Sequence, residues 1–315
     1  MKRETIICVT PNAALDRTLV VPDFAVGHIS RIPNAIAVPG GKGLNVMRAI
    51  EILGGRALAM GLLGGHTGRT VAAIVKEDGY QAAWTRFAGE TRTCTIIASP
   101  GGNSTVINES GQIALGDWRA LVDDICSVVA REAARTVCLC GSLPVGAPDS
   151  APADLIEQVS AMGARIWVDS SKGWLKNAIE AKPHAIKVNR EEFLEALGAE
   201  ARTKVELVAL ARRLNADGIK IIVISLGAEG ALLVSGKLAV KATPPEIQVL
   251  DPVASGDCLH AGIVTALADG VDLAEALRRG VAAGTVNALY AGGAQFPHTH
   301  YLEVLAETRV EKLLD

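Results

Sequence analysis

The sequence has few aromatic residues, no basic tract and no long apolar stretch. Aromatic side chains make up only 3% of the 315 residues, too few to build stacking platforms for nucleic-acid bases. The net charge of −3, without a basic cluster, also argues against a nucleic-acid partner. No stretch could span a bilayer, and the N-terminal Met-Lys-Arg-Glu leads into a β-like segment rather than a signal peptide. We therefore expect a cytoplasmic location, with neither a nucleic-acid nor a membrane partner.

Common signatures of cofactor and metal sites are also missing. The six cysteines form no Cys-x-x-Cys pair, and Cys138 and Cys140 share one face of an apolar run. They are interpreted as small buried hydrophobic residues in a reducing compartment. The chain contains no G-x-x-x-x-G-K-[ST] run and no G-x-G-x-x-G after a strand. Neither a P-loop nor a Rossmann cofactor site is therefore supported.

Short β-branched runs alternate with segments of helical spacing along the chain. The predicted strands are Thr5–Thr10, Ala57–Leu62, Thr136–Cys140, Arg165–Asp169, Ala185–Val188 and Ile219–Ser225. The predicted helices include Leu44–Leu53, Arg69–Asp78, Asp154–Met162 and Val205–Ala216. This alternation predicts an α/β fold, a mostly parallel sheet with helices on both faces and its active site at the C-terminal ends of the strands.

Two segments interrupt this alternation. Residues 18–38 and 84–107 read as strands separated by Gly, Pro and Asn turns, with no helix between them. We interpret them as a small β-lid over the main sheet, inserted twice into one domain that spans residues 1–315. No internal repeat or low-complexity linker divides the chain.

The segment Asp251-Pro-Val-Ala-Ser-Gly-Asp-Cys258 is the most informative motif. It places Asp257 at the start of an apolar, helix-compatible run, directly behind the small residues Ala254, Ser255 and Gly256. A helix start gathers unpaired N–H groups and positive dipole, and so attracts phosphate. A carboxylate beside such an anion site can accept a proton from a hydroxyl group while a phosphoryl group is transferred. The motif suggests a kinase that acts on a small alcohol.

Other polar residues allow a functional and a structural interpretation. Gly40-Gly-Lys-Gly-Leu-Asn45 before a helix either approaches a ligand or makes a tight turn. Asp16, after the first strand, either holds sugar hydroxyls or forms a turn. Arg31 and Arg92, both in the predicted lid, either bind a phosphate or are solvated.

Two further strand exits carry polar groups. Asn189 and Glu192 either order water around a metal or cap a helix. Ser225-Leu-Gly-Ala-Glu-Gly230 could border a nucleotide.

Taken together, these motifs resemble the PfkB carbohydrate-kinase family of ribokinase-like fold, and more narrowly its 1-phosphofructokinase and tagatose-6-phosphate kinase branch. The resemblance runs nearly end to end. Its motifs are Asn12-Ala-Ala-Leu-Asp-Arg17, Gly40-Gly-Lys-Gly-Leu-Asn45, Leu53-Gly54, Leu63-Gly-Gly-His-Thr-Gly68, Glu90-Thr-Arg-Thr93, Ile107-Asn-Glu109, Gly141-Ser-Leu-Pro144, Val168-Asp-Ser170, Lys187-Val-Asn-Arg-Glu-Glu192 and Ala254-Ser-Gly-Asp257. One such motif alone is weak evidence, but this many in the family's order is strong.

The resemblance implies roles for individual residues. Asp257 would be the base, and the amides of Ala254, Ser255, Gly256 and Asp257 would form the anion hole. The acceptor would be bound by Asp16, Gly41, Lys42, Asn45 and Ser142, and its phosphate by Arg31 and Arg92. ATP would be bound by Asn189, Ser225, Gly227, Gly230 and Asn287, with Glu192 ordering Mg²⁺. The family's lid also often forms a dimer contact, which implies a homodimer.

The chain departs from the family pattern at several positions: Ala254 replaces glycine, Pro252 threonine, Ala13 proline, Met47 alanine and Val188 proline. These departures suggest a divergent member. The expected reaction is ATP- and Mg²⁺-dependent phosphorylation of a primary hydroxyl of a ketohexose phosphate. Fructose 1-phosphate is the favoured acceptor, followed by tagatose 6-phosphate and fructose 6-phosphate. The alternatives are a kinase of an unphosphorylated sugar or nucleoside, and a non-catalytic sugar-phosphate binding protein.

Overall fold

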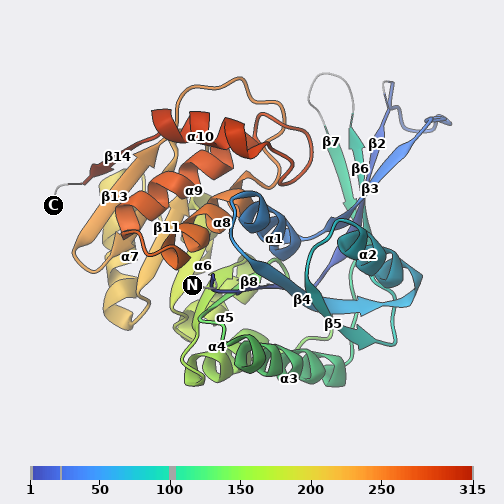
Figure 1. Ribbon diagram of the computed structural model, residues 1–315, viewed down its shortest axis with the longest axis horizontal. Helices are drawn as coiled ribbons and strands as arrows, with labels where there is room; N and C mark the ends of the chain where they lie inside the picture. Colours follow the sequence, from blue (N-terminus) through green and yellow to red (C-terminus); the bar gives the residue numbers. More distant parts are fainter. Residues whose placement is uncertain (1–2, 22, 99–103, 314–315) are drawn as a thin grey trace.

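Two β-sheets of different size organise the chain (Figure 1). The computed structural model describes residues 3–21, 23–98 and 104–313. In the large sheet, ten strands lie in the order β14-β13-β12-β11-β10-β9-β8-β1-β4-β5. These strands are β1 (Ile6–Thr10), β4 (Ala57–Gly64), β5 (Ala82–Phe87), β8 (Thr136–Cys140), β9 (Arg165–Asp169), β10 (Ala185–Asn189), β11 (Ile221–Ser225), β12 (Ala231–Ser235), β13 (Leu238–Thr243) and β14 (Arg309–Lys312).

The large sheet is parallel from β11 to β5, and only β12, β13 and β14 pair antiparallel. All residues of β1, β4 and β8 are buried, because helices cover both faces of the sheet. The predicted bounds of β8 and β9 agree with the structure, and the other predicted strands differ from it by one or two residues at an end.

Ten helices in the described ranges form two layers, one on each face of the large sheet. One layer consists of five helices whose buried side chains share one hydrophobic core with the sheet: α1 (Lys42–Ile52), α2 (Gly65–Glu77), α8 (Ser255–Ala268), α9 (Leu273–Asn287) and α10 (His298–Glu307). The other contains α3 (Leu115–Glu132), α4 (Ala151–Ala161), α5 (Lys172–Glu180), α6 (Arg190–Leu197) and α7 (Lys204–Asp217). The predicted α/β fold with helices on both faces is confirmed. None of the helices in the described ranges is long and apolar enough to cross a membrane.

The small sheet has four strands in the order β3-β2-β6-β7 and projects from one end of the large sheet (Figure 1). Its strands are β2 (Ala14–Val20), β3 (Ala35–Gly40), β6 (Arg92–Ala98) and β7 (Ser104–Asn108). The prediction that the whole of 84–107 belongs to this lid is wrong, because Trp84–Phe87 lie in β5, which pairs with β4 in the large sheet. Residues 22 and 99–103 of those segments lie outside the described residues. That the small sheet acts as a lid stays a prediction.

The parallel strands end together along one edge of the large sheet, where strand order reverses between β8 and β1. Strands β1 and β8 are neighbours in space, but the sheet continues from β1 to β4 in one direction and from β8 to β9 in the other. Such a switch point leaves a crevice beyond the carboxyl ends of the strands, the usual ligand site of open α/β sheets. The chain continues from this edge into most of the residues singled out by the sequence.

Candidate active site

Asp257 lies in the first turn of α8, and its side chain is buried. The helix begins after Ala254, whose φ of 64° lies in the left-handed region. In this conformation the β-carbon of an alanine is sterically unfavourable, whereas glycine has no β-carbon. The replacement of the family's glycine by Ala254 therefore strains the backbone at this position. The sharp turn at Ala254 directs the start of α8, and with it Asp257, toward the switch-point crevice.

The start of α8 offers fewer free amides than the sequence suggested. The Ser255 N–H donates to the carbonyl oxygen of Pro252 at 3.2 Å. By helix geometry the amides of Gly256 and Asp257 have no intrahelical acceptor. A β-carbon on Gly256 would lie 2.9 Å from Nζ of Lys187, so this glycine lets a lysine ammonium approach the helix start. The amides of Gly256 and Asp257 and the ammonium group of Lys187 thus lie together at the start of α8.

A buried carboxylate, Asp169, lies at the centre of a charged cluster. Its Oδ1 accepts from Nζ of Lys42 at 2.8 Å, and its Oδ2 accepts from Nζ of Lys187 at 2.5 Å. Lys42 Nζ is also 3.7 Å from Oε1 of Glu192. Although burial opposes ionisation, Lys187 and Lys42 hold the pKa of Asp169 well below its usual range. Asp169 therefore ties α1, β9 and β10 together as a permanently charged group.

Asp257 has the opposite electrostatic environment. Burial, followed by the nearby charge of Asp169, raises the pKa of Asp257 to about 6. The charges of Lys187 and Lys42 oppose this rise, as does the hydrogen bond that Asn45 Nδ2 donates to Asp257 Oδ2 at 2.7 Å. A carboxylate with a pKa near 6 is ionised at neutral pH and still accepts a proton readily, as general-base chemistry requires.

A second carboxylate, Asp16, lies on β2 near its inner end. A β-carbon on Gly40 would lie 2.1 Å from Cγ of Asp16, so the absence of a side chain there lets Asp16 lie across β3. Burial raises the pKa of Asp16, against the charges of Arg92 and Arg48. At the end of β1, Asn12 Nδ2 donates to Oγ of Ser142 at 3.0 Å and so joins the β1 and β8 strand exits.

Arg92 begins β6 at the same end of the small sheet as Asp16. Its Nε donates to the carbonyl oxygen of Asn12 at 3.2 Å, and its Nη1 donates to Oδ1 of Asn108 at 3.1 Å. Arg31 is exposed in the connection between β2 and β3, beyond their outer ends, whereas Arg92 pairs with Ala14 at the inner end of β2. The structure therefore does not bring the two arginines together within one chain.

The proposed nucleotide and metal residues follow β10 and β11, whose ends are paired through Asn189 and Ser225. Asn189 caps α6, because its Oδ1 accepts from the Glu192 N–H at 2.8 Å and its own N–H donates to Glu192 Oε2 at 3.0 Å. The capping interpretation of Asn189 is thus confirmed. Gly227 and Gly230 bound the short turn after β11.

The side chain of Asn287 forms hydrogen bonds within the protein. Its side chain is fully buried at the end of α9. Nδ2 donates to the carbonyl oxygen of Val253 at 2.7 Å and to Oγ of Ser255 at 3.2 Å. Oδ1 accepts from the Ala294 N–H at 2.9 Å. These bonds hold the loop before α8, and a contact of Asn287 with ATP stays a prediction.

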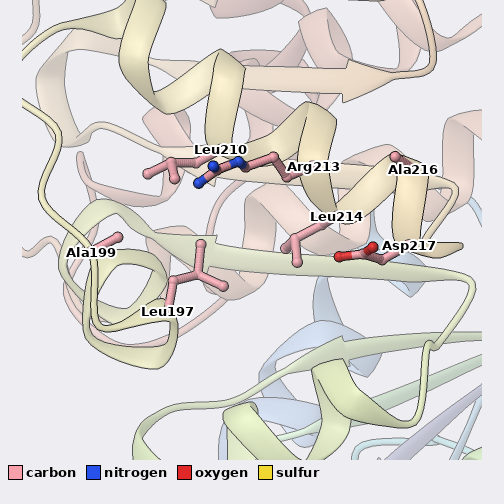
Figure 2. Close-up of a pocket in the computed structure, with 7 residues that line it drawn as sticks. All are labelled: Leu197, Ala199, Leu210, Arg213, Leu214, Ala216 and Asp217. Carbon is pink, nitrogen blue, oxygen red and sulfur yellow. The ribbon is translucent and has the colours of Figure 1, made fainter.

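No role was predicted from the sequence for Asp169, Lys187 or Arg48. The sequence does indicate that two of them are paired, because Lys187 interrupts one apolar strand, Asp169 ends another, and a buried charge requires a partner. A separate pocket of about 470 Å³ between α6 and α7 contains none of these groups. Figure 2 shows that Leu197, Leu210 and Arg213 are among the residues that line it.

Residues 7–299 match the pfkB family of carbohydrate kinases. The chain belongs to this family. The 1-phosphofructokinase of Rhodobacter capsulatus is 34% identical over 312 residues, which cover 98% of each protein. The 1-phosphofructokinase of Bacillus subtilis is 30% identical over 284 residues, 90% of this chain and 92% of that protein. Phosphofructokinase-2 from Escherichia coli, in its tetrameric inhibited form, superposes with a TM-score of 0.89 at 25% identity, covering 97% of this chain and 99% of that one.

Membership in the pfkB family makes this protein an enzyme, a phosphotransferase that acts on an alcohol group of a carbohydrate. The resemblance to the phosphofructokinase branch is confirmed by the two curated relatives. The alternative of a non-catalytic binding protein is therefore not retained. The six cysteines are free thiols, and all except Cys126 are buried, as expected for small hydrophobic residues.

Proposed function

We propose that this pfkB-family enzyme transfers the γ-phosphoryl group of ATP to a primary hydroxyl of a ketohexose phosphate, with fructose 1-phosphate as the favoured acceptor. The observation that carries the proposal is the buried Asp257 at the start of α8, with a pKa of about 6 and beside Lys187. The 1-phosphofructokinase relatives support the choice of acceptor.

Asp257 acts as the general base. Asn45 holds its Oδ2 by a hydrogen bond, which leaves Oδ1 to accept the proton of the acceptor hydroxyl. As the oxygen attacks, negative charge develops on the transferring phosphoryl group. The amides of Gly256 and Asp257 and the ammonium group of Lys187 stabilise that charge through fixed dipoles and a buried cation. The protein itself forms no covalent intermediate, because positioning and charge stabilisation suffice for phosphoryl transfer.

Arg92 binds the phosphate that the acceptor already carries. Within the described residues its hydrogen bonds reach two neutral oxygens, so its positive charge is not neutralised by an ion pair. The bond from Nη1 to Asn108 and the bond from the Thr93 N–H to Glu109 orient the start of β6. The Ile107-Asn-Glu109 element thus positions Arg92, and this favours a phosphorylated acceptor over the alternative of a free sugar or nucleoside. That Arg31 shares this role stays a prediction.

The residues that would hold ATP lie at the exits of β10 and β11 and include Ser225, Gly227 and Gly230. Glu192 is the residue that would hold Mg²⁺. Its Oε2 is occupied by the cap of α6, while its Oε1 contacts, among the described residues, only Lys42, at 3.7 Å. The described residues contain no group of three or more His, Cys, Asp or Glu side chains arranged to hold a metal ion. One carboxylate oxygen suits an ion that keeps several waters and binds substrate phosphates, as Mg²⁺ does. When bound, Mg²⁺ supplies charge neutralisation on the phosphate oxygens.

Steady-state turnover with Mg-ATP and a panel of acceptors tests the proposal. The panel contains fructose 1-phosphate, tagatose 6-phosphate, fructose 6-phosphate, the corresponding free sugars and a nucleoside, with ADP release as the readout. We expect turnover with ketohexose phosphates only. Asp257→Asn should lower kcat by at least about 10²-fold, as expected for loss of a general base. Asp154→Asn, a change of an exposed aspartate in the first turn of α4, is the matched control.

Each outcome of the panel is informative. Turnover with free sugars only would move the protein to the alternative acceptor class and leave Arg92 with a structural role. Activity that survives in Asp257→Asn would overturn the assignment of the base. Turnover that EDTA does not abolish would contradict the requirement for Mg²⁺.

We also propose that the small sheet pairs two copies of the chain. Val20, Ile36 and Val106 are each more than half exposed on this sheet. The strand register places Ile36 and Val106 in one row with Thr18, on the face that also carries Asp16. Apolar side chains gathered on an unpartnered face favour association. A second copy would cover this outer part of the face, and the structural relative from Escherichia coli forms tetramers in its inhibited state. The reducing cytoplasm stays our expected location.

A further inference from the structure

Arg48 is a buried arginine that forms no hydrogen bond with a carboxylate of the described residues, although the charge of Asp16 acts on it at longer range. It lies in the middle of α1, and only 4% of the residue is exposed. Nη1 donates to the carbonyl oxygen of Pro39 at 2.8 Å, and Nη2 donates to Oδ1 of Asn45. Both acceptors are neutral, and Nε has no hydrogen-bond partner in the part of the chain that the structure describes. Burying a guanidinium group in this way is costly, so the position calls for an explanation in terms of what the group does.

The hydrogen bonds of Arg48 lead directly to the proposed base. Asn45 precedes Arg48 by three residues, so both side chains lie on one face of α1. Asn45 accepts from Arg48 through Oδ1 and donates through Nδ2 to Oδ2 of Asp257. Gly293 also packs closely against Asn45, because a β-carbon there would lie 2.9 Å from its Oδ1. A chain of two hydrogen bonds therefore runs from Arg48 through Asn45 to Asp257.

The chemistry of the three groups permits only one arrangement of this chain. An asparagine side chain has one acceptor end and one donor end, which can exchange places by a half-turn of the amide. A guanidinium group only donates, and an ionised carboxylate only accepts. An Asn45 amide between them must direct Oδ1 to Arg48 and Nδ2 to Asp257. The bond from Arg48 to the Pro39 carbonyl oxygen fixes the guanidinium group itself.

We propose that Arg48 is a positioning residue that fixes the orientation of the Asn45 amide and thereby holds the Asp257 carboxylate ready to accept the proton of the acceptor hydroxyl. The proposal rests on the base role proposed above for Asp257. Without the donor-only group at position 48, the amide of Asn45 can turn and accept through its oxygen from a protonated Asp257. The protonated carboxyl, which cannot act as a base, then gains a hydrogen bond that Arg48 otherwise prevents.

This change alters the proton affinity of Asp257 in a defined direction. The charged groups that face Asp257 are Asp169 from β9, Lys187 from β10 and Lys42 from α1. The two lysines and the Asn45 hydrogen bond lower its pKa, whereas burial and Asp169 raise it. Removing the contribution of Asn45 leaves the lysines in place and raises the pKa further. The acid limb of the activity profile should therefore move to higher pH.

A double-mutant cycle between positions 48 and 45 tests the proposal. Arg48→Met should lower kcat by about 10- to 100-fold, the effect of one hydrogen bond to a charged group, with little change in KM for Mg-ATP. Its acid limb should move up by about one pH unit. Arg48→Lys keeps a donor-only group and should recover part of the activity. In the Asn45→Ala background, Arg48→Met should cause no further loss, because both changes interrupt the same chain.

If the losses of kcat in Arg48→Met and Asn45→Ala simply add in the double variant, the proposal is overturned. It is also overturned if Arg48→Met lowers the melting temperature but leaves the acid limb of the activity profile in place. Where Arg48→Met does not fold, Arg48→Gln replaces it in the same cycle, because glutamine can donate to the Pro39 carbonyl oxygen but does not enforce one orientation on Asn45. The base role is tested separately by Asp257→Asn. Activity that survives in that variant overturns the proposed function, whereas additive losses beside an inactive Asp257→Asn overturn only the role of Arg48.

Discussion

Asp257→Asn should inactivate the enzyme and at the same time stabilise its fold above neutral pH. The folded protein raises the pKa of Asp257 to about 6, against 3.8 for an ordinary aspartate. The causes are burial and the neighbouring charge of Asp169. Because the folded state holds the proton more tightly than the unfolded chain, ionising Asp257 opposes folding. Asparagine has nearly the same shape, can still accept from Asn45, and carries no charge to bury.

The magnitude follows from the two pKa values. The difference between about 6 and 3.8 is about two, and each pKa unit corresponds to about 1.4 kcal/mol. The stability associated with the protonated carboxyl is fully present below about pH 4 and is lost as pH rises through about 6. Above that range the ionised Asp257 costs on the order of 3 kcal/mol, and at pH 5 about half of that. Only 5% of the residue is exposed, so water does not screen the effect.

Urea unfolding at pH 5, 6.5 and 8 measures the effect. We expect Asp257→Asn to raise the free energy of unfolding by on the order of 3 kcal/mol at pH 8, with an unchanged m-value and a smaller gain at pH 5. Asp154→Asn makes the same chemical change in the first turn of α4, where the side chain is exposed, and should alter stability by no more than about 0.5 kcal/mol at any pH. A gain that is independent of pH, or a loss of stability at pH 8, would refute the reasoning.

Two further predictions concern the small sheet. Arg92→Ala should raise KM for the phosphosugar by about 10- to 100-fold through loss of charged hydrogen bonds, whereas the exposed Arg86→Ala on β5 should not. An equal effect on KM for a free sugar would contradict the phosphate-binding role. Ile36→Asp should halve the mass measured by light scattering, because it places a charge on the proposed dimer face. Val205→Asp, on an exposed position of α7, should leave the mass unchanged, and a monomeric native protein would rule out the dimer.

Local sequence pattern was sufficient for the architecture of the large sheet. Continuous apolar runs such as Thr136–Cys140 can be buried on both faces only between two helical layers, so the alternation of strands and helices implied a parallel sheet. The position of Asp257 at a helix start also followed from the chain itself, because small residues precede it and an apolar run follows. The order of the family motifs along the chain was sufficient for the family.

Pairing and burial were decided only by the tertiary structure. The sequence did not tell that Trp84 pairs with Gly61 in the large sheet, because an isolated strand pattern does not specify its neighbour. It placed Arg31 and Arg92 in one lid, but the strand register separates them. It offered Asn287 as a ligand-site residue, but it did not show the hydrogen bonds by which this amide holds the loop before α8.

The electrostatics of the site likewise came from the fold. Asp169 and Lys187 are 18 residues apart, and Asn45 and Asp257 are 212 apart, yet each pair forms a hydrogen bond. The pKa of a carboxyl group depends on the water it has lost and on charges within a few ångströms, which no local pattern contains. The sequence by itself therefore determined which groups are present and at which strand and helix ends they lie. Only the packing of α1 and α8 against β9 and β10 decided which of two aspartates stays ionised and which can take up a proton.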